Sequence, residues 1–214
     1  MAKASGGTRN SGPSSNPNLK GVGNTQKQLS HEGEMNYADA VDHIMNLTGV
    51  DEGDADNMYW AIYDWSGSMS DETRAASRGE SSDKYDILRA DRLERFIELS
   101  PKWNGGTTWR GLDLPDNVIE QFKVGQTFDP MGIASWSTEQ DVARGFTRLS
   151  NQFYLRCEKP QNGTSIKFAS NCPSEDEVMT SGRCQYRVVN ITKTTDGYRP
   201  ITIVDLEPIA NKKK

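Results

Sequence analysis

The sequence has too few cysteines and histidines for several common kinds of site. The sequence has three cysteines, Cys157, Cys172 and Cys184, which is too few for a four-cysteine zinc site. Their odd number and the lack of a C-x-x-C spacing argue against a disulfide framework. His31 and His43 cannot make a three-histidine zinc site, and a Ser-His or Cys-His nucleophile would have to use one of them. Chemistry in this chain must therefore rely on carboxylates, arginine, serine and aromatic side chains.

Motifs that bind nucleotide phosphates and segments that cross membranes are also missing. There is no Gly-Lys dipeptide and hence no Walker A loop, and neither G-x-G-x-x-G nor G-x-S-x-G occurs. No apolar run reaches the length of roughly 18 residues at which a membrane span is expected, and residues 1–10 lack the apolar core of a secretory signal. The expected location is the cytoplasm of the cell that makes the protein, with delivery into another cell left open.

The charge and the apolar content limit the class of protein further. A formal net charge of −5 argues against a nucleic acid as partner, because such proteins present basic surface to phosphate. Hydrophobic residues make up 34% of the chain, which suggests that part of it adds nothing to a core. Residues 1–34 are rich in Gly, Ser, Asn and Pro, and we predict that they form a disordered tail before one domain of residues 35–214.

The spacing of apolar residues changes near Pro101. Before it, apolar side chains at helical spacing predict helices around residues 37–47, 58–65 and 87–99. The acidic run at residues 51–56 lacks the spacing of a calcium loop, and we expect a solvated turn there. After Pro101, short strand-like runs alternate with turns that contain glycine. The predicted fold is α+β, with a helical lobe (35–100) packed on a mostly antiparallel, two-sheet β-core (101–214).

Arg110 and Gly111 form the first polar feature that points to a site. They stand at the predicted end of a strand over residues 107–110. The arginine is either a surface group or a fixed guanidinium for a phosphate, and the glycine would let the backbone approach a ligand.

Ser135 and Ser137 form the second feature, at a predicted junction of a strand and a helix. Ser137, with Gln140 three residues later, matches a capping box. Because alternate residues of a strand share a face, Ser135 is expected to point the same way as Ser137. A serine that points inward from a core strand needs a polar partner.

Glu175 and Glu177 form the third feature, within the run Ser-Glu-Asp-Glu that enters a predicted strand. In an extended chain they would lie on one face, with their Cα atoms about 6.5–7 Å apart. Two carboxylates at such a separation can divide the work between a bond that breaks and an incoming acceptor. An acidic loop is the alternative interpretation.

The order of these features is more specific than any of them alone. The sequence reads T-T-W-R-G-L, V-G-Q-T-F, G-I-A-S-W-S-T-E-Q-D-V-A-R-G-F, S-E-D-E-V-M-T-S-G and Q-Y-R-V-V-N in turn. Residues 93–214 thereby resemble the R-S-E class of mono-ADP-ribosyltransferases, the group of arginine-modifying bacterial toxins and vertebrate ecto-enzymes. Ile133 and Trp136 stand where that family usually has an aromatic residue and a threonine, but neither departure removes a catalytic group.

The resemblance implies a set of roles around NAD. Arg110 would contact a phosphate of NAD, and the backbone of Gly111 would hold the nicotinamide amide. Ser135 would hydrogen-bond Glu177, which would in turn hydrogen-bond the nicotinamide ribose and stabilise the positive charge that develops on that ring. Phe146, on the helix after the serines, either lines the nicotinamide pocket or belongs to the core.

The acceptor side is less specified by the resemblance. Glu175 would orient or deprotonate the acceptor, and a glutamate there goes with arginine as the acceptor. Phe168, in the turn that precedes the two glutamates, either docks a partner or belongs to the core. No metal is required, and the partners expected are NAD and a protein.

The sequence is compatible with three hypotheses about function. The first is a protein-arginine mono-ADP-ribosyltransferase, acting as a toxin or as a mobile-element enzyme that modifies host proteins. The second is an NAD glycohydrolase that uses water as the acceptor at the same site. The third is an interaction module without enzymatic activity that keeps the fold.

Overall fold

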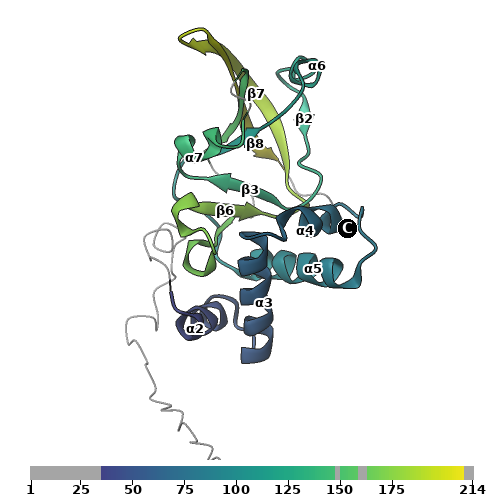
Figure 1. Ribbon diagram of the computed structural model, residues 1–214, viewed down its shortest axis with the longest axis vertical. Helices are drawn as coiled ribbons and strands as arrows, with labels where there is room; N and C mark the ends of the chain where they lie inside the picture. The colour runs from purple at the N-terminus through teal and green to yellow at the C-terminus, as the bar shows by residue number, and fades with distance from the viewer. Residues whose placement is uncertain (1–34, 148–149, 159–162, 210–214) are drawn as a thin grey trace, which may run out of the picture.

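The computed structural model describes residues 35–147, 150–158 and 163–209, with a group of helices followed by a sheet (Figure 1). The predicted tail of residues 1–34 lies outside the described residues. The helices are α2 (Tyr37–Thr48), α3 (Glu52–Trp65), α4 (Ser70–Ser77), α5 (Lys84–Leu99), α6 (Asp116–Ile119) and α7 (Gln140–Arg144), with short 3-10 helices η2 (Lys167–Ala169) and η3 (Pro173–Glu175). The strands are β1 (Thr108–Leu112), β2 (Thr127–Phe128), β3 (Ala134–Ser137), β4 (Gln152–Cys157), β5 (Thr164–Ser165), β6 (Glu177–Thr180), β7 (Gln185–Asp196) and β8 (Arg199–Ile209).

The helical lobe begins at side chains that cap its helices. Asn36 accepts a hydrogen bond from the backbone N–H of Asp39 at 3.1 Å, which starts α2. Asp51 accepts from the N–H of Asp54 at 2.9 Å and starts α3. The acidic run is therefore the first turns of a helix, and the prediction of a solvated turn there is wrong. Carboxylates are favourable at this place because the helix dipole is positive at its N-terminus.

Helix α4 was not predicted from the sequence. It carries hardly any apolar residues, and Thr73 is its only buried residue. A helix without an apolar stripe gives no periodic signal, so the sequence pattern cannot reveal it. Helix α5, which was predicted, begins at Asp83, whose carboxylate accepts from the N–H of Tyr85 at 2.7 Å.

One eight-stranded sheet makes up the second half of the chain, in the order β2-β7-β8-β4-β1-β3-β6-β5. The α+β class is confirmed, but the prediction of two separate sheets needs correction. Strands β1 and β3 share a single register pair, Trp109 with Ser137, so one narrow junction joins a group of five strands to a group of three. Such a junction depends on pairing between distant segments, which strand periodicity does not report.

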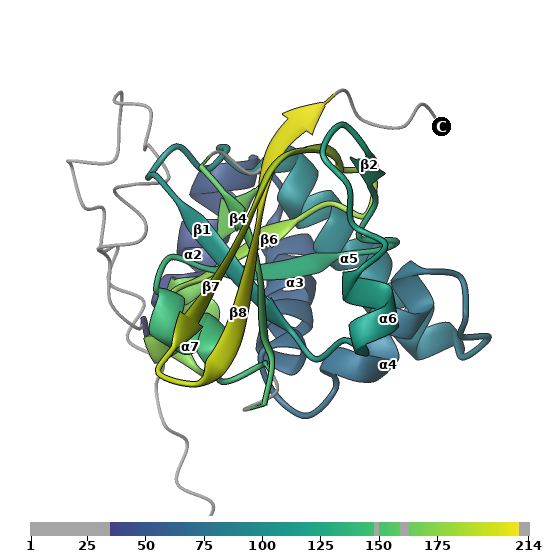
Figure 2. The same ribbon diagram turned by 90° about the horizontal axis from the view of Figure 1, so that it is seen from above.

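Most neighbouring strands are antiparallel, as predicted, and β4 with β8 is the parallel pair among the described strands. The long β7–β8 hairpin turns at Gly197 and extends beyond the rest of the sheet (Figure 1); seen from above, it passes in front of the other strands (Figure 2). The three-stranded end of the sheet lies against the helical lobe. Its Met179, with Ile133 before β3 and Phe168 in η2, shares one hydrophobic core with α2, α3 and α5.

Candidate functional site

The structure brings the predicted site residues to one cleft. Arg110 is on β1, Ser135 on β3 and Glu177 on β6, and these strands are neighbours in the sheet. The cleft, with a volume of about 340 Å³, is lined by all three and also by Gly111, Phe146 and Glu175. Residues spread over a long stretch of sequence therefore face one cavity between the sheet and the helical lobe.

Glu177 is the most deeply buried carboxylate of the cleft, with 5% of its surface exposed. Its Oε1 accepts hydrogen bonds from the Ser135 hydroxyl and, at 2.7 Å, from the indole N–H of Trp65. Burial raises the pKa of Glu177, and the bonds from Ser135 and Trp65 oppose that rise because they stabilise the charged form. The result is a carboxylate held in one orientation by two donors.

Glu175 reaches the cleft by a different route from the one predicted. It belongs to η3 and not to a strand, and Asp176 between the two glutamates has a left-handed backbone with φ of 47°. The expectation that both glutamates lie on one face of an extended strand is therefore wrong. The bend is held by Ser137, whose hydroxyl donates to the carbonyl oxygen of Glu175 at 2.7 Å, and by an ion pair of Asp176 with Lys167 at 2.8 Å. Burial raises the pKa of Glu175.

Ser137 also differs from its predicted role. Helix α7 begins at Gln140 with Glu139 as its N-cap and no side-chain capping bond, so the capping box is not formed. The Ser137 hydroxyl instead accepts from the N–H of Glu139 at 3.0 Å and donates to Glu175. This serine ties the end of β3 to the turn that carries one of the two glutamates.

Arg110 lies in the middle of β1, since the strand continues to Leu112. Its guanidinium donates to the backbone oxygen of Ser135 at 3.5 Å, and among the described residues it forms no ion pair. Burial, reinforced by the nearby charge of Arg74, lowers the pKa of Arg110 to about 10. It still carries its charge at neutral pH, so the cleft holds a half-buried cation that lacks a carboxylate partner in the described part of the chain.

Gly111 is required by packing. A Cβ at this position would overlap the carbonyl oxygen of Ala143 in α7 and come within 2.9 Å of the Thr147 methyl carbon. The sequence suggested that the glycine lets the backbone approach a ligand, whereas the structure gives a second reason, which is the close approach of α7 to β1. Any side chain here would push α7 away from the cleft.

Phe146 and Phe168, for each of which the sequence allowed two interpretations, lie in opposite environments. Phe146 is 57% exposed and lines the cleft, so its assignment to the core is wrong. Phe168 is fully buried, and its ring packs against those of His43 and Phe96, with centroids 4.7 and 6.3 Å away. Phe168 is a core residue and does not dock a partner.

Two residues of the cleft were missed by the sequence predictions. Trp65, at the end of α3, is almost fully buried, and its indole N–H lies between Glu177 and the Ser135 hydroxyl, 3.1 Å from the latter. Arg74, on α4, places its guanidinium carbon 5.3 Å from the centroid of the Trp65 ring. In the sequence, Trp65 has the pattern of an ordinary apolar helix residue, and Arg74 lies on α4, which gives no periodic signal. Two arginines, Arg74 and Arg110, therefore line the cleft.

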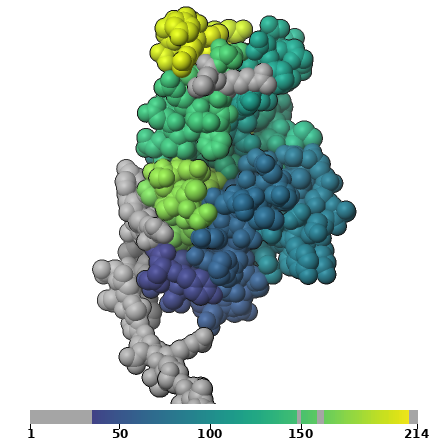
Figure 3. Space-filling model, viewed as in Figure 1, coloured from purple at the N-terminus to yellow at the C-terminus, as the bar shows by residue number. Residues whose placement is uncertain are grey.

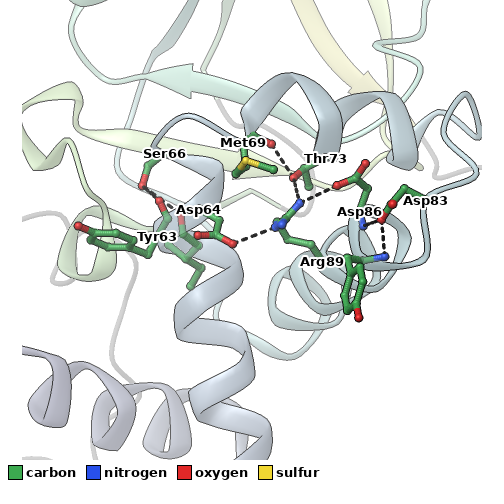
Figure 4. Close-up of polar contacts among 10 residues, drawn as sticks. Tyr63, Asp64, Ser66, Met69, Thr73, Asp83, Asp86 and Arg89 are labelled. Carbon is green, nitrogen blue, oxygen red and sulfur yellow. Dashed lines mark hydrogen bonds and ion pairs between the residues drawn. The ribbon is translucent and has the colours of Figure 1, made fainter.

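A part-buried network of polar contacts joins the helices next to these two residues (Figure 4). The Arg89 guanidinium donates to Asp64 at 3.0 Å and to Thr73 at 3.4 Å, and so links α5 to α3 and α4. Asp64 precedes Trp65 and Thr73 precedes Arg74 in the sequence. Arg89 thus fixes the backbone next to both side chains that the helical lobe contributes to the cleft.

The described residues show neither a metal-binding group of side chains nor a membrane-spanning helix. Within residues 35–147, 150–158 and 163–209, no group of three or more His, Cys, Asp or Glu side chains is arranged to hold a metal ion. None of the helices in this part of the chain is long and apolar enough to cross a bilayer.

Comparison with known proteins points to the ADP-ribosyltransferases. No protein-family model matches the chain. A Mycobacterium avium (strain 104) protein, Mav, whose name places it with the NAD(+)–arginine ADP-ribosyltransferases, is 26% identical over 165 residues, which is 77% of this chain. The chain spans only 19% of the length of that relative.

Solved structures of ADP-ribosyltransferases share the architecture. The Vibrio splendidus enzyme Vis, in complex with agmatine, gives a TM-score of 0.61 at 16% identity and covers 84% of this chain and 88% of its own. Exoenzyme S from Pseudomonas aeruginosa, in complex with human 14-3-3 protein beta and bound to carba-NAD, gives 0.56 at 19% identity, covering 79% and 82%. The chain described here therefore has the fold of the ADP-ribosyltransferases.

Proposed function

We propose that this protein transfers ADP-ribose from NAD to an arginine side chain and releases nicotinamide. The observation that carries the proposal is the meeting of Arg110, Ser135 and Glu177 in one cleft, with Glu177 held by two donors. The name of the Mycobacterium avium relative and the agmatine complex of Vis support arginine as the acceptor.

Arg110 and Arg74 are the proposed partners of the NAD diphosphate. Both line the cleft, and neither is neutralised there by a close carboxylate, since the ion pair of Arg74 with Asp71 is long, at 3.4 Å, and exposed on the Asp71 side. The Nε of Arg74 is buried with no hydrogen-bond partner among the described residues. Guanidinium groups suit phosphate oxygens because they present several donors in a fixed plane. They would supply the positive charge without a metal.

Glu177 is the proposed catalytic residue for breaking the glycosidic bond. As the bond between the ribose carbon and the nicotinamide nitrogen breaks, both electrons leave with nicotinamide and positive charge develops on the ribose ring. A carboxylate fixed next to that ring stabilises the charge without having to reorganise, an effect worth about 3–4 kcal/mol in comparable cases. Ser135 would keep this carboxylate in place, Gly111 would hold the nicotinamide amide through its backbone, and Phe146 would cover the ring.

Glu175 is the proposed residue for the acceptor. The arginine nitrogen forms the new bond to the ribose carbon and must lose a proton, which the Glu175 carboxylate can accept. Burial raises the pKa of this carboxyl, and a higher pKa makes it a better base near neutral pH. The bend at Asp176 turns Glu175 away from the path of β6 while both glutamates still line the cleft.

Trp65 is proposed as a positioning residue. It acts through Glu177 and Ser135, because its indole N–H donates to both. Because Ser135 and Trp65 both donate to Oε1, the carboxylate of Glu177 cannot rotate without losing hydrogen bonds inside a buried site.

The experiment is to measure nicotinamide release from NAD with and without agmatine, in the presence of EDTA, and to identify the product by mass spectrometry. The proposal expects ADP-ribosylated agmatine to form and the rate to be insensitive to EDTA. Release of nicotinamide with free ADP-ribose as the only product would instead identify an NAD glycohydrolase. Absence of both NAD turnover and NAD binding would favour an interaction module.

A further inference from the structure

A cluster of aromatic side chains on α2 and α3 extends from the hydrophobic core, to which Tyr59 belongs, to the surface. Tyr37, Tyr59, Trp60 and Tyr63 form this aromatic face, and their rings contact one another with centroids 5.0–6.1 Å apart. Tyr37, Trp60 and Tyr63 are 47%, 48% and 37% exposed. Single exposed aromatic residues are ordinary, but a contiguous exposed cluster is typical of an interaction surface.

The segment that carries the aromatic face, residues 35–73, is acidic, although Asp54, Asp64 and Asp71 within it pair with Arg95, Arg89 and Arg74. Residues 35–73 include no Lys or Arg, and their acidic side chains are Asp39, Asp42, Asp51, Glu52, Asp54, Asp56, Asp64, Asp71 and Glu72. Asp42, Glu52 and Asp56 line a hollow beside Tyr37, and the Tyr37 hydroxyl donates to Asp56. Electron-rich rings and carboxylates on one surface favour the same ligand, a cation.

The aromatic face leads towards the acceptor side of the cleft. Tyr63 is one helical turn before Ser66 and Gly67, which line the cleft together with Glu175. The Ser66 hydroxyl accepts from the N–H of Asn171, in the turn that precedes the glutamates, at 2.8 Å. In Figures 1 and 3, α2 and α3 lie at the end of the molecule opposite the β7–β8 hairpin, and the top of α3 reaches the level of β6.

We propose that the aromatic face is the docking surface for a basic, arginine-rich segment of the acceptor protein. The inference rests on the proposed function and adds the chemistry of the partner to it. One arginine enters the cleft opposite Glu175, while neighbouring cationic side chains stack on Trp60 and Tyr63 and pair with Asp42 and Glu52. Cation–π contacts with tryptophan and tyrosine and complementary charge both favour such a segment.

The face can be changed without disturbing the cleft. Tyr63 points away from the Arg89 network, on the other side of α3 from the Asp64 carboxylate (Figure 4). Trp60 is as exposed as Tyr37, and neither Trp60 nor Tyr63 lines the cleft. Substitutions there leave Trp65, Arg74 and the two glutamates with their present partners.

The test compares a small acceptor with a large one. Wild type, Trp60→Ala/Tyr63→Ala and Asp42→Asn/Glu52→Gln are each assayed with agmatine and with a synthetic peptide of alternating arginine and serine. We expect KM for the peptide to rise about tenfold in both variants, while KM for agmatine and kcat stay the same. Added salt is expected to raise the peptide KM of wild type and to affect the charge variant less, because exposed charges are screened.

The chain offers matched controls at the opposite end of the molecule. Tyr198→Ala removes an aromatic side chain that is 89% exposed at the turn of the β7–β8 hairpin, and Glu120→Gln/Glu207→Gln makes the same change in charge directly after α6 and on β8. Both are expected to keep the peptide KM of wild type. An equal rise of KM in these controls, or an unchanged peptide KM in the face variants, overturns the docking surface.

Direct binding separates this inference from the proposed function. Peptide affinity, measured by fluorescence anisotropy without NAD, should fall in the face variants even if no transfer is detected. Transfer to neither agmatine nor peptide would refute the proposed function alone. If the face variants bind the peptide as tightly as wild type does, the proposal is wrong.

Discussion

The strands and the helical lobe contribute to the same cleft in different ways. The strand residues stand in short polar patterns, as in Arg110 with Gly111, and together with Glu175 of η3 they include the groups proposed to touch the reacting atoms. The lobe contributes Trp65 from the apolar end of α3, and Arg74 from α4, which lacks an apolar stripe. The strands thus carry the proposed chemistry, whereas the lobe supplies positioning and phosphate contacts.

This division teaches that a catalytic group and its support need not come from the same part of the chain. Glu177 on β6 is held by Trp65, which lies 112 residues earlier. Arg89 in turn holds the backbone beside Trp65 without touching the cleft. Changes in the strands should therefore abolish activity, and changes in the lobe should reduce or shift it.

The largest expected effect is on the strand side, at Glu177. Glu177→Gln keeps the size of the side chain but removes the charge that would stabilise the ribose cation. We expect both agmatine modification and NAD hydrolysis to fall by roughly 10²-fold or more. Nicotinamide release measures both, and a near wild-type rate in this variant would remove Glu177 from the mechanism.

A smaller and selective effect is expected at Glu175. Glu175→Gln should lower transfer to agmatine by about tenfold or more, because the amide cannot take the acceptor proton. NAD hydrolysis should largely persist, since bond cleavage does not require an activated acceptor. The ratio of modified agmatine to free ADP-ribose is the measurement, and an equal loss of both products contradicts the division of roles.

The lobe is expected to give a weaker effect with a distinctive pH dependence. Trp65→Phe keeps the packing but removes the N–H that favours the charged form of Glu177, so the pKa of that carboxyl should rise further. We expect kcat to fall about three- to tenfold, with the acid limb of the pH–rate profile shifted to higher pH.

Trp103→Phe is the matched control for that prediction. Trp103 is also a buried tryptophan, but its indole N–H donates to the carbonyl oxygen of Gly106 at 3.2 Å in the other hydrophobic core. This control should lose stability without a shift of the pH profile. The same shift in both variants would mean that Trp65 acts through packing alone.

The smallest effect concerns the stability of the lobe. Burial lowers the pKa of His43 from 6.5 to about 4, so the unfolded chain binds a proton in this range and the folded chain does not. Stability is therefore lost as the pH falls from 6.5 towards 4, by about 0.5–1 kcal/mol between pH 7 and pH 6. His43→Leu should flatten this slope in urea unfolding, whereas His31→Gln should leave it unchanged. An unchanged slope in His43→Leu would show that other groups govern it.

The sequence by itself determined the local parts of this protein. Apolar periodicity predicted three of the four helices of the lobe, and alternation with glycine turns predicted the strands other than the two-residue strands β2 and β5. Arg110, Ser135 and Glu177 predicted a single site because their order along the chain resembles that of the R-S-E class of mono-ADP-ribosyltransferases.

Only the tertiary structure decided the parts that depend on distant contacts. The bend at Asp176 is held by Ser137 and Lys167, and the glycine at 111 is required by a helix that reaches it from residue 143. In the sequence, Trp65 cannot be told from an ordinary core residue. Its role comes from hydrogen bonds of its N–H to Ser135 and Glu177, which lie 70 and 112 residues away in the sequence. Periodicity shows which face of a helix or strand is buried, but not which residues lie against that face. For this reason the roles of Trp65 and Arg74 at the cleft could be seen only in the folded structure.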